Sequence, residues 1–199
     1  NSMRFSFILL AGGKSTRFKS VLPKPYHLIA GKTLIEISLN KIKRFKEFKK
    51  IIVVYNKGHL KFLKKINLKN IKLIQGGETR QQSTYNALKY LHKQRKINKV
   101  LIHDAARPNF STKLIKKILI KAKKNEVVVP VIRPQDAIKK KDRENKFLNL
   151  DRNNFFLTQT PQCFNLKFIF NLHKKNKEKY KDDDLSLVDN NKVELLSGE

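Results

Sequence analysis

Short apolar runs alternate with helical patterns along most of this sequence, and this alternation constrains the fold more than any other feature. Five runs have the length of buried strands, at 5–10, 51–55, 71–75, 99–103 and 126–131. Helical patterns lie between them, at 33–45, 60–66, 80–91 and after Ser111. Such an order is typical of a parallel sheet covered on both faces. The sequence therefore predicts an α/β fold with a Rossmann-like, open, mostly parallel sheet and helices on both faces.

The alternation breaks at 138–150, which is strongly charged and has few apolar residues. We expect this segment to form a projecting β-arm, spanning about 137–157. A strand at 155–158, a helix at 165–173 and a strand candidate at 193–196 follow. No internal repeat and no low-complexity linker marks a second domain. We therefore expect one domain over residues 3–199.

The chain is strongly basic, with 45 Lys and Arg against 16 Asp and Glu and a net charge of +29. Polyanions bind such proteins by counterion release. However, 36 of the basic residues are lysines spread through nearly every segment, and runs such as 113–124 have the pattern of a solvated helix face. We therefore do not expect a nucleic-acid partner, although the field would attract nucleotides and sugar phosphates.

The 199-residue chain has a single cysteine, Cys163, which excludes a disulfide framework and a cysteine-based zinc site. We expect Cys163 to be a small core residue. The apolar runs are far shorter than the ~18–20 residues of a membrane span. Met3 leads into the first run without a cleavage pattern. We expect a cytoplasmic protein with no membrane partner.

Small and basic residues follow the first strand directly, in the segment 10–18 (LAGGKSTRF). In open parallel sheets, ligands bind beyond the carboxyl ends of the strands. Glycines there allow backbone N–H groups to approach a phosphate, and Arg17 could bind two phosphate oxygens at once. The segment matches neither the G-x-G-x-x-G pattern nor the P-loop. A phosphate site is the favoured interpretation, and a plain strand-to-helix turn is the alternative.

Lys24 stands between Pro23 and Pro25. The two prolines predict extended backbone on both sides of this lysine. A lysine held in this way can act as a fixed positive charge on a phosphoryl group. The alternative is that Lys24 is one surface lysine among 36.

These motifs together resemble a known family. The segment 10–36 resembles the head of nucleotidyltransferases that activate sugar and alditol phosphates. Three more motifs follow in order: 76–83 (GGETRQQS), 103–108 (HDAARP) and 151–153 (DRN), the last preceding 159–162 (QTPQ). The whole set, over about 5–199, resembles the 2-C-methyl-D-erythritol 4-phosphate cytidylyltransferases of non-mevalonate isoprenoid biosynthesis. The Arg80-Gln81 pair also resembles versions fused to a cyclodiphosphate synthase domain.

The resemblance implies a nucleotide-diphospho-sugar transferase-like fold and a reaction of CTP with methylerythritol phosphate that releases pyrophosphate. The phosphate oxygen of the substrate would attack the α-phosphorus in line, so catalysis would consist of positioning and charge stabilisation. Arg17 and Lys24 would stabilise the charge on the pentavalent α-phosphate. Arg152 would hold the methylerythritol phosphate, in its own site or in that of the neighbouring subunit. A homodimer formed through the arm is implied as well.

The remaining implied site residues bind nucleotide, metal or substrate. Backbone contacts to the nucleotide would come from Ala11, Gly12 and Gly13, and the cytosine edge would meet Gly77, Glu78 and Ser83. Asp104, with Ala105 beside it, would face the ribose and phosphates and hold Mg²⁺, which prefers carboxylate and phosphate oxygens. Thr160, Asp183 and Arg152 would bind the alditol phosphate.

Simpler roles remain open for several of these residues. Asp104 could be a turn residue, and Glu78 and Ser83 could belong to a helix start capped by Thr79, with Ser83 exposed. Arg152 could pair with Asp151, and Asp183 could be part of a solvated acidic cap. Arg107 is expected to pin its loop. The histidines at 27, 59, 92 and 173 are expected at the surface or in packing.

Three departures from the family pattern bear on specificity and completeness. Ser15 stands where the family often has glycine, and Ala137 stands where a hydroxyl residue often helps to bind the substrate phosphate. Because of Ala137, a ribitol- or other alditol-phosphate cytidylyltransferase stays an alternative, as does a non-catalytic nucleotide- or RNA-binding module. The family usually continues with an Asn-x-Lys segment, and we expect this tail to be missing after Glu199.

Overall fold

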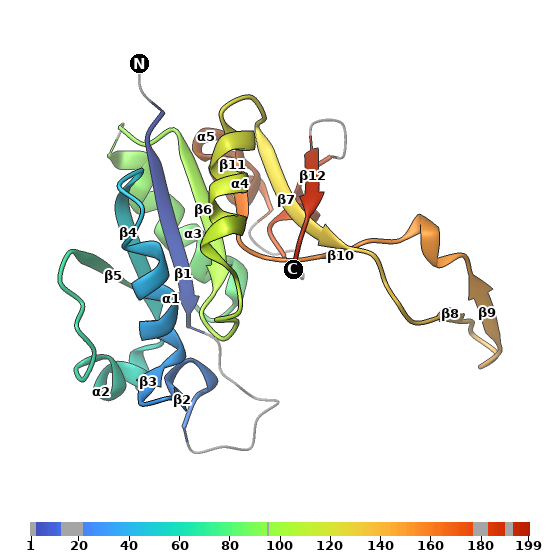
Figure 1. Ribbon diagram of the computed structural model, residues 1–199, viewed down its shortest axis with the longest axis horizontal. Helices are drawn as coiled ribbons and strands as arrows, with labels where there is room; N and C mark the ends of the chain where they lie inside the picture. Colours follow the sequence, from blue (N-terminus) through green and yellow to red (C-terminus); the bar gives the residue numbers. More distant parts are fainter. Residues whose placement is uncertain (1–2, 13–21, 95, 177–182, 190–192) are drawn as a thin grey trace.

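A computed structural model describes residues 3–12, 22–94, 96–176, 183–189 and 193–199 of the chain (Figure 1). Its centre is an eight-stranded sheet in the order β10-β7-β11-β6-β1-β4-β5, with β12 paired to β7. The strands are β1 (Phe5–Ala11), β4 (Phe48–Tyr55), β5 (Ile71–Gln75), β6 (Lys99–Asp104), β7 (Val127–Ile132), β10 (Leu157–Thr158), β11 (Gln162–Asn165) and β12 (Val193–Ser197). Strand β1 runs parallel to both β4 and β6, and β4 runs parallel to β5. The predicted α/β fold with a mostly parallel sheet is confirmed.

The burial of strand β1 explains why its sequence is apolar throughout and does not alternate between apolar and polar residues. All seven of its residues are buried. Phe7 and Leu9 belong to one core cluster, and Ile8 and Leu10 belong to a second cluster. Successive side chains of a strand point to opposite faces of the sheet. A continuous apolar run therefore indicates a strand that is covered on both faces.

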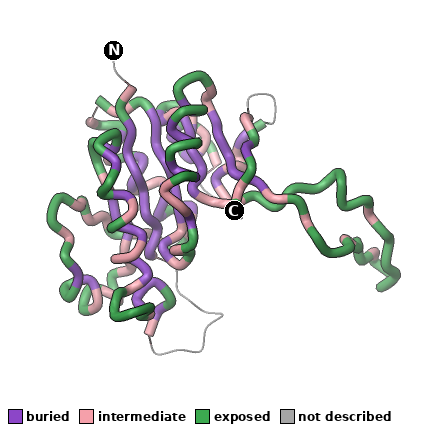
Figure 2. Tube along the Cα trace, in the orientation of Figure 1, coloured by how far each residue is buried: buried purple, intermediate pink, exposed green. Residues whose placement is uncertain are grey.

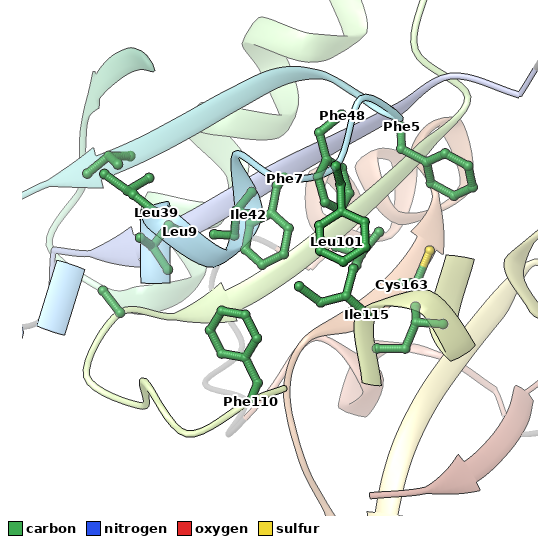
Figure 3. Close-up of a cluster of buried hydrophobic side chains, with 14 of the residues drawn as sticks. Phe5, Phe7, Leu9, Leu39, Ile42, Phe48, Leu101, Phe110, Ile115 and Cys163 are labelled. Atoms are coloured by element: carbon green, nitrogen blue, oxygen red, sulfur yellow. The ribbon is translucent and has the colours of Figure 1, made fainter. Parts of the chain in front are cut away.

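Two pairs of helices provide this cover. Helices α1 (Leu34–Ile42) and α4 (Thr112–Ala122) pack on the face that holds Phe7, whereas α3 (Arg80–Lys93) and α5 (Leu166–Lys175) pack on the face that holds Ile8 (Figure 1). The first cluster joins aromatic rings of the sheet to Leu39, Ile42 and Ile115 of the helices (Figure 3). The sheet is thus covered on both faces, and in such sheets ligands bind beyond the carboxyl ends of the strands.

Side-chain caps fix where these helices begin. Thr33 accepts a hydrogen bond from the Glu36 N–H, and the Glu36 carboxylate accepts one from the Thr33 N–H, which completes a capping box. Thr79 caps α3, the predicted cap Ser111 begins α4, and Asn165 caps α5. The short helix α2 (Leu60–Leu63) ends before the predicted limit of 66.

Strand β11 was not predicted. It lies antiparallel between β6 and β7, with Cys163 opposite Leu101 and Val128. Its four residues are too few to produce a periodicity, and two of them, Gln162 and Asn165, are polar. Together with β10, which also pairs antiparallel with β7, it makes the sheet a mixed one. Cys163 is fully buried in the core, as expected, and burial raises the pKa of its thiol to about 12.

The projecting β-arm is present, built from β8 (Ile138–Lys141) and β9 (Phe147–Leu150) in antiparallel pairing. It extends away from the sheet, and its residues are largely exposed (Figure 2). A second small hairpin pairs β2 (Leu28–Ile29) with β3 (Lys32–Thr33). Among the described residues, no helix is both long and apolar enough to span a bilayer.

Candidate active site

The candidate site lies where the parallel strands β1, β4, β5 and β6 end. Their registers place Leu10 beside Asp104 and Tyr55 beside Gln75. The Ala105 N–H donates to Leu10 O at 2.8 Å, and the Gly76 N–H donates to Tyr55 O at 2.8 Å. The motifs that follow three separate strands are therefore joined at one edge of the sheet.

Gly76 and Gly77 form a glycine surface that lies too close to the start of α3 to leave room for a side chain at either position. A Cβ atom on Gly76 would lie 2.7 Å from Ser83 Oγ, and one on Gly77 would lie 2.5 Å from Gln82 Cβ. Gly12 faces the same hydroxyl, since its Cβ would lie 3.4 Å from Ser83 Oγ. The end of β1, at Ala11 and Gly12, therefore lies against the start of α3 with no side chain between them.

The segment 76–83 forms a helix start, which was the simpler alternative for Glu78 and Ser83. Thr79 accepts from the Gln82 N–H at 3.1 Å, and the Glu78 N–H donates to Gln82 Oε1 at 2.8 Å. That alternative placed Ser83 at the surface, but Ser83 is buried, and its Oγ accepts a hydrogen bond from the Gly77 N–H at 3.0 Å. The N–H groups of Gly76, Gly77 and Glu78 are therefore all used within the protein.

Asp104 ends β6, and its carboxylate is bound by Arg80. The Arg80 Nε donates to Asp104 Oδ1 at 3.1 Å, whereas Arg107 Nε is 3.9 Å from Oδ2. The Arg107 side chain is 62% exposed and its N–H donates to Asp104 O at 3.0 Å, in agreement with the expected role in holding its loop. Asp104 therefore has one oxygen fixed by Arg80 and a second that is less engaged.

Arg80 also reaches a buried acid that the sequence analysis did not single out. Its Nη1 donates to Asp184 Oδ2 at 3.0 Å, and Asp184 Oδ1 lies 2.9 Å from His173 Nε2. Burial alone would raise the pKa of Asp184, but the charge of Arg80 and the hydrogen bond from His173 lower it below its usual value. Burial alone would likewise lower the pKa of Arg80, but the two carboxylates raise it.

The expectation for His173 was only partly right. It is buried, as a packing residue would be, but its Nε2 also has a polar partner, Asp184 Oδ1, at 2.9 Å. The other three histidines pack as expected: His59 lies against Tyr26, His92 stacks on Phe170, and His27 Nε2 is 2.7 Å from Leu22 O.

Asp183, next to this buried acid, is held by neutral donors. Its Oδ2 accepts from Thr158 Oγ1 at 2.9 Å and from Gln162 Nε2 at 2.8 Å, and its Oδ1 accepts from Ser186. Burial alone would raise the pKa of Asp183, but these hydrogen bonds lower it overall. Asp183 is therefore an ordered, ionised carboxylate rather than a freely solvated acidic cap.

Lys24 borders a cavity of about 400 Å³ beside this network, together with His103, Arg107, Gln159 and Thr160. Its backbone differs from the prediction. Pro23 is extended, with φ −62° and ψ 142°, but 24–26 form a 3-10 turn in which the Tyr26 N–H donates to Pro23 O. Proline fits the first turn of a helix because no backbone N–H is needed there. Pro23 and Pro25 are buried and Lys24 is exposed, so the lysine is still presented from a fixed turn.

His103 sets the direction of the Thr160 hydroxyl in this cavity. Its Nε2 is 2.6 Å from Arg107 O, which can only accept, and its Nδ1 is 2.7 Å from Thr160 Oγ1. Burial lowers the pKa of His103 to about 4, so the ring is neutral at pH 7. A neutral ring has one donor nitrogen, which must be Nε2. Thr160 therefore donates to Nδ1, and its oxygen lone pairs remain for a donor on a ligand.

The predicted site residue Arg152 lies away from this cavity. The predicted residues Gly13 and Arg17 lie outside the described residues. Arg152 belongs to the short turn 152–154 at the base of β9, where it is exposed and its Nη1 donates to Gln135 O. The arm carries this turn away from the sheet (Figure 1). Within one chain, Arg152 does not reach the cavity, and its predicted role in a neighbouring subunit stays a prediction.

Within the described ranges, no group of three or more His, Cys, Asp or Glu residues could hold a metal ion by itself. Asp104 could contribute one carboxylate oxygen. Mg²⁺ is usually held by one or two carboxylates together with substrate phosphates and water. The residues present therefore fit a Mg²⁺ ion that arrives with a nucleotide, and they do not fit a metal site made by the protein alone.

Comparison with known proteins agrees with this geometry. Residues 5–199 match the family model of 2-C-methyl-D-erythritol 4-phosphate cytidylyltransferase. The chain is 46% identical over 198 residues to the bifunctional enzyme IspD/IspF of Pelagibacter ubique, covering 99% of this chain but only 53% of that protein. It thus spans about half the length of this relative.

Two further relatives are monofunctional by name. The 2-C-methyl-D-erythritol 4-phosphate cytidylyltransferase of Clostridium beijerinckii is 34% identical over 199 residues, covering 97% of this chain and 85% of that one. The crystal structure of 4-diphosphocytidyl-2C-methyl-D-erythritol synthase from Anaerococcus prevotii superposes with a TM-score of 0.84 at 31% identity, covering 99% and 88%. The chain therefore belongs to the 2-C-methyl-D-erythritol 4-phosphate cytidylyltransferase family of nucleotidyl-transferring enzymes.

Proposed function

We propose that this chain transfers the cytidylyl group of CTP to 2-C-methyl-D-erythritol 4-phosphate, with release of pyrophosphate, as a step of non-mevalonate isoprenoid synthesis in the cytoplasm. One observation carries the proposal beyond family membership. The glycine segment 76–78 leads into α3, whose Arg80 binds Asp104 at the carboxyl edge of the sheet, and His103, the residue before Asp104, lines the cavity together with Lys24 and Thr160. This edge is where open α/β sheets bind nucleotides.

The nucleotide would lie across the glycine surface. Ala11, Gly12 and Gly13 would offer backbone groups, and Gly77, Glu78 and Ser83 would meet the cytosine edge. The Ser83 oxygen already accepts from the Gly77 N–H, so its own proton is the group that can be donated to the base. Ala105 and Asp104 would lie near the ribose and phosphates. Side chains at 76 and 77 would collide with Ser83 and Gln82 of α3, so they would push this backbone away from the helix and toward the nucleotide.

Mg²⁺ would be held by Asp104 and the triphosphate, and it would neutralise phosphate charge when bound. Arg80 fixes Oδ1 of Asp104, which leaves Oδ2 as the oxygen better placed to contact the ion. This arrangement suits a metal that is shared with the nucleotide, because a single carboxylate oxygen would bind the bare ion weakly.

The substrate would occupy the side of the site formed by Thr160 and Asp183, with Arg152 reaching it from the arm of a second subunit. The Thr160 oxygen can accept a hydrogen bond but its proton is used by His103, so we assign it to a hydroxyl of the alditol rather than to its phosphate. Asp183 is a carboxylate at the same side and can also accept from a hydroxyl. Ala137 offers no hydroxyl to the phosphate, which puts more of that task on Arg152.

The reaction itself needs no nucleophile from the protein. A phosphate oxygen of the substrate forms a bond to the α-phosphorus while the bond to the β-phosphate oxygen breaks and pyrophosphate leaves. Negative charge builds on the α-phosphoryl oxygens in this step. Lys24 and Arg17 would stabilise that charge, and a cation presented from a rigid turn needs little reorganisation when the charge appears.

A homodimer formed through the arm is part of this proposal, and the arm has the apolar surface that a partner would cover. The large apolar side chains that are more than one third exposed here are Phe147, Leu148, Phe155, Phe156 and Leu157. An arm this poorly packed on its own body would gain most of its apolar burial from a second subunit.

A pyrophosphate-release assay tests the proposal, with CTP and Mg²⁺ and with methylerythritol phosphate or ribitol phosphate as the acceptor. We expect turnover with methylerythritol phosphate, and a much slower reaction when UTP replaces CTP. Turnover with ribitol phosphate alone would instead support an alditol-phosphate cytidylyltransferase of different specificity. Absence of turnover with both, accompanied by salt-sensitive oligonucleotide binding, would support an RNA-binding module.

A further inference from the structure

Arg80 connects two acids that lie far apart in the sequence. Its Nε binds Asp104, 24 residues away, and its Nη1 binds Asp184, 104 residues away, at 3.1 and 3.0 Å. The Arg80 and Asp104 side chains are each 27% exposed, whereas Asp184 is 1% exposed. One guanidinium group therefore spans from the open edge of the sheet to a buried carboxylate.

We propose that Arg80 is a positioning residue that fixes Asp104 for Mg²⁺-nucleotide binding and, through Asp184, fixes the segment that presents Asp183 to the alditol phosphate. This inference rests on the proposed function. It adds a residue that acts through two carboxylates, Asp104 and Asp184, and that sets the relative placement of the two binding sides.

The nucleotide side of the argument concerns the freedom of the Asp104 side chain. A carboxylate at the end of a strand can rotate, and a metal ion shared with a triphosphate requires it to point in one direction. Arg80 removes this freedom by holding Oδ1, and it does so from the first turn of α3, where Thr79 caps the helix. Arg80 can hold both acids because its guanidinium donors have a fixed planar geometry, which the single ammonium group of lysine lacks.

The substrate side depends on the segment 183–188. Asp184 is anchored by Arg80 and His173, and the Leu185 N–H donates to Gln162 Oε1 at 3.2 Å. Asp183 directly precedes Asp184 in the chain, so the anchoring of Asp184 also determines where Asp183 lies. Loss of Arg80 would leave the buried Asp184 carboxylate without its arginine partner, with the contact to His173 still in place. Such a loss is strongly destabilising in general, and we expect the segment to shift.

Four variants test the proposal: Arg80→Met, Arg80→Lys, Asp184→Asn and the double variant Arg80→Met/Asp184→Asn. The double variant removes the buried charge together with its partner, so it separates a folding defect from a positioning defect. Arg44→Met is the matched control, because Arg44 is exposed near the end of α1 and away from the site. Circular dichroism melting first establishes that each variant is folded.

Two measurements then follow for each folded variant. Isothermal titration calorimetry gives the Kd of CTP over a range of Mg²⁺ concentrations, without substrate or turnover. Steady-state kinetics give kcat and the KM of methylerythritol phosphate. Loss of a residue that orients a metal ligand typically weakens metal affinity or activity by ~10–100-fold.

We expect Arg80→Met to weaken Mg²⁺-dependent CTP binding by about 10–100-fold, with a smaller change when Mg²⁺ is absent. The double variant should melt at a higher temperature than Arg80→Met but show the same weak binding. Asp184→Asn keeps the pair of Arg80 with Asp104, so it should raise the KM of methylerythritol phosphate more than the Kd of CTP. Arg44→Met should behave as the unchanged protein.

Two results would overturn the inference. One is a folded Arg80→Met or double variant whose CTP binding keeps its normal dependence on Mg²⁺. The other is an Arg80→Lys variant that matches the unchanged protein in both measurements, since charge without the planar group would then suffice. Failure of the proposed function is a separate outcome, because it would appear as absent turnover by the unchanged protein.

Discussion

Replacement of Gly77 by alanine tests whether the glycine surface binds the nucleotide. The new Cβ would lie 2.5 Å from Gln82 Cβ and 2.9 Å from Gln82 Oε1. Carbon atoms in contact need ~3.5–4.0 Å, so the backbone at 77 must move by about 1 Å away from α3. Strain of this kind costs typically ~1–3 kcal/mol. Because the movement is directed into the space assigned to cytosine, we expect the KM for CTP to rise by about 10–100-fold.

The matched control is Gly58→Ala. Gly58 is exposed on a short turn, and a Cβ there would meet only Asn56 Oδ1, at 3.4 Å. Pyrophosphate release with varied CTP gives the KM, and thermal melting shows how much of the strain is retained in the folded protein. We expect the control to match the unchanged protein in both. A Gly77→Ala variant with unchanged KM for CTP would show that this surface does not contact the nucleotide, whatever its melting temperature.

Three further predictions address charge, pH and assembly. Lys24→Ala should lower kcat by ~10²-fold or more, because one transition-state charge contact is lost. The control Lys32→Ala, on the neighbouring hairpin, should leave kcat unchanged. An unchanged kcat for Lys24→Ala in the same assay would remove Lys24 from the mechanism. Burial keeps His103 neutral in the folded protein down to a pH of about 4, whereas the imidazole of the unfolded chain, with a pKa of 6.5, already binds a proton below pH 6.5. The free energy of unfolding should therefore fall by about 3 kcal/mol as the pH is lowered from 6.5 to 4. Urea unfolding without Mg²⁺ or nucleotide measures this slope, and a His103→Gln variant with the same slope would refute the assignment. Phe147→Asp/Leu148→Asp should convert a dimer to a monomer in light scattering, and a variant that stays dimeric would place the interface elsewhere than on β9.

The sequence predicted the helices and the long buried strands but missed short strands, for a physical reason. Strands such as β1 and β6 are buried on both faces, so nearly every residue in them is apolar and the run is visible without any periodicity. Strand β11 escaped notice because it is four residues long and inserted antiparallel, with Gln162 at its start. Its place in the sheet depends on pairing with β6 and β7, which no local pattern records.

The candidate site could be predicted where its chemistry follows a strand end. The roles of Gly77, Asp104 and Thr160 rest on the family resemblance and stay predictions; the structure places Gly77 and Asp104 at strand ends and Thr160 at the cavity. The backbone of Lys24 was predicted incorrectly, since proline on both sides suggested extended chain and the structure closes a 3-10 turn there. Local rules left both conformations accessible, and packing of Pro25 and Tyr26 into the core decides between them.

The ion pairs of Arg80 could not be predicted from the sequence, because they depend on how the chain returns to the sheet. Asp184 reaches Arg80 only because α3 and α5 pack on the same face, next to β11. His173 on α5, which was expected at the surface or in packing, is buried with it, and the two side chains form the buried end of this network. Such a network has a cost of desolvation that apolar residues would not have. Its position between Asp104 and Asp183 therefore argues that it is retained for the geometry of the site rather than for stability.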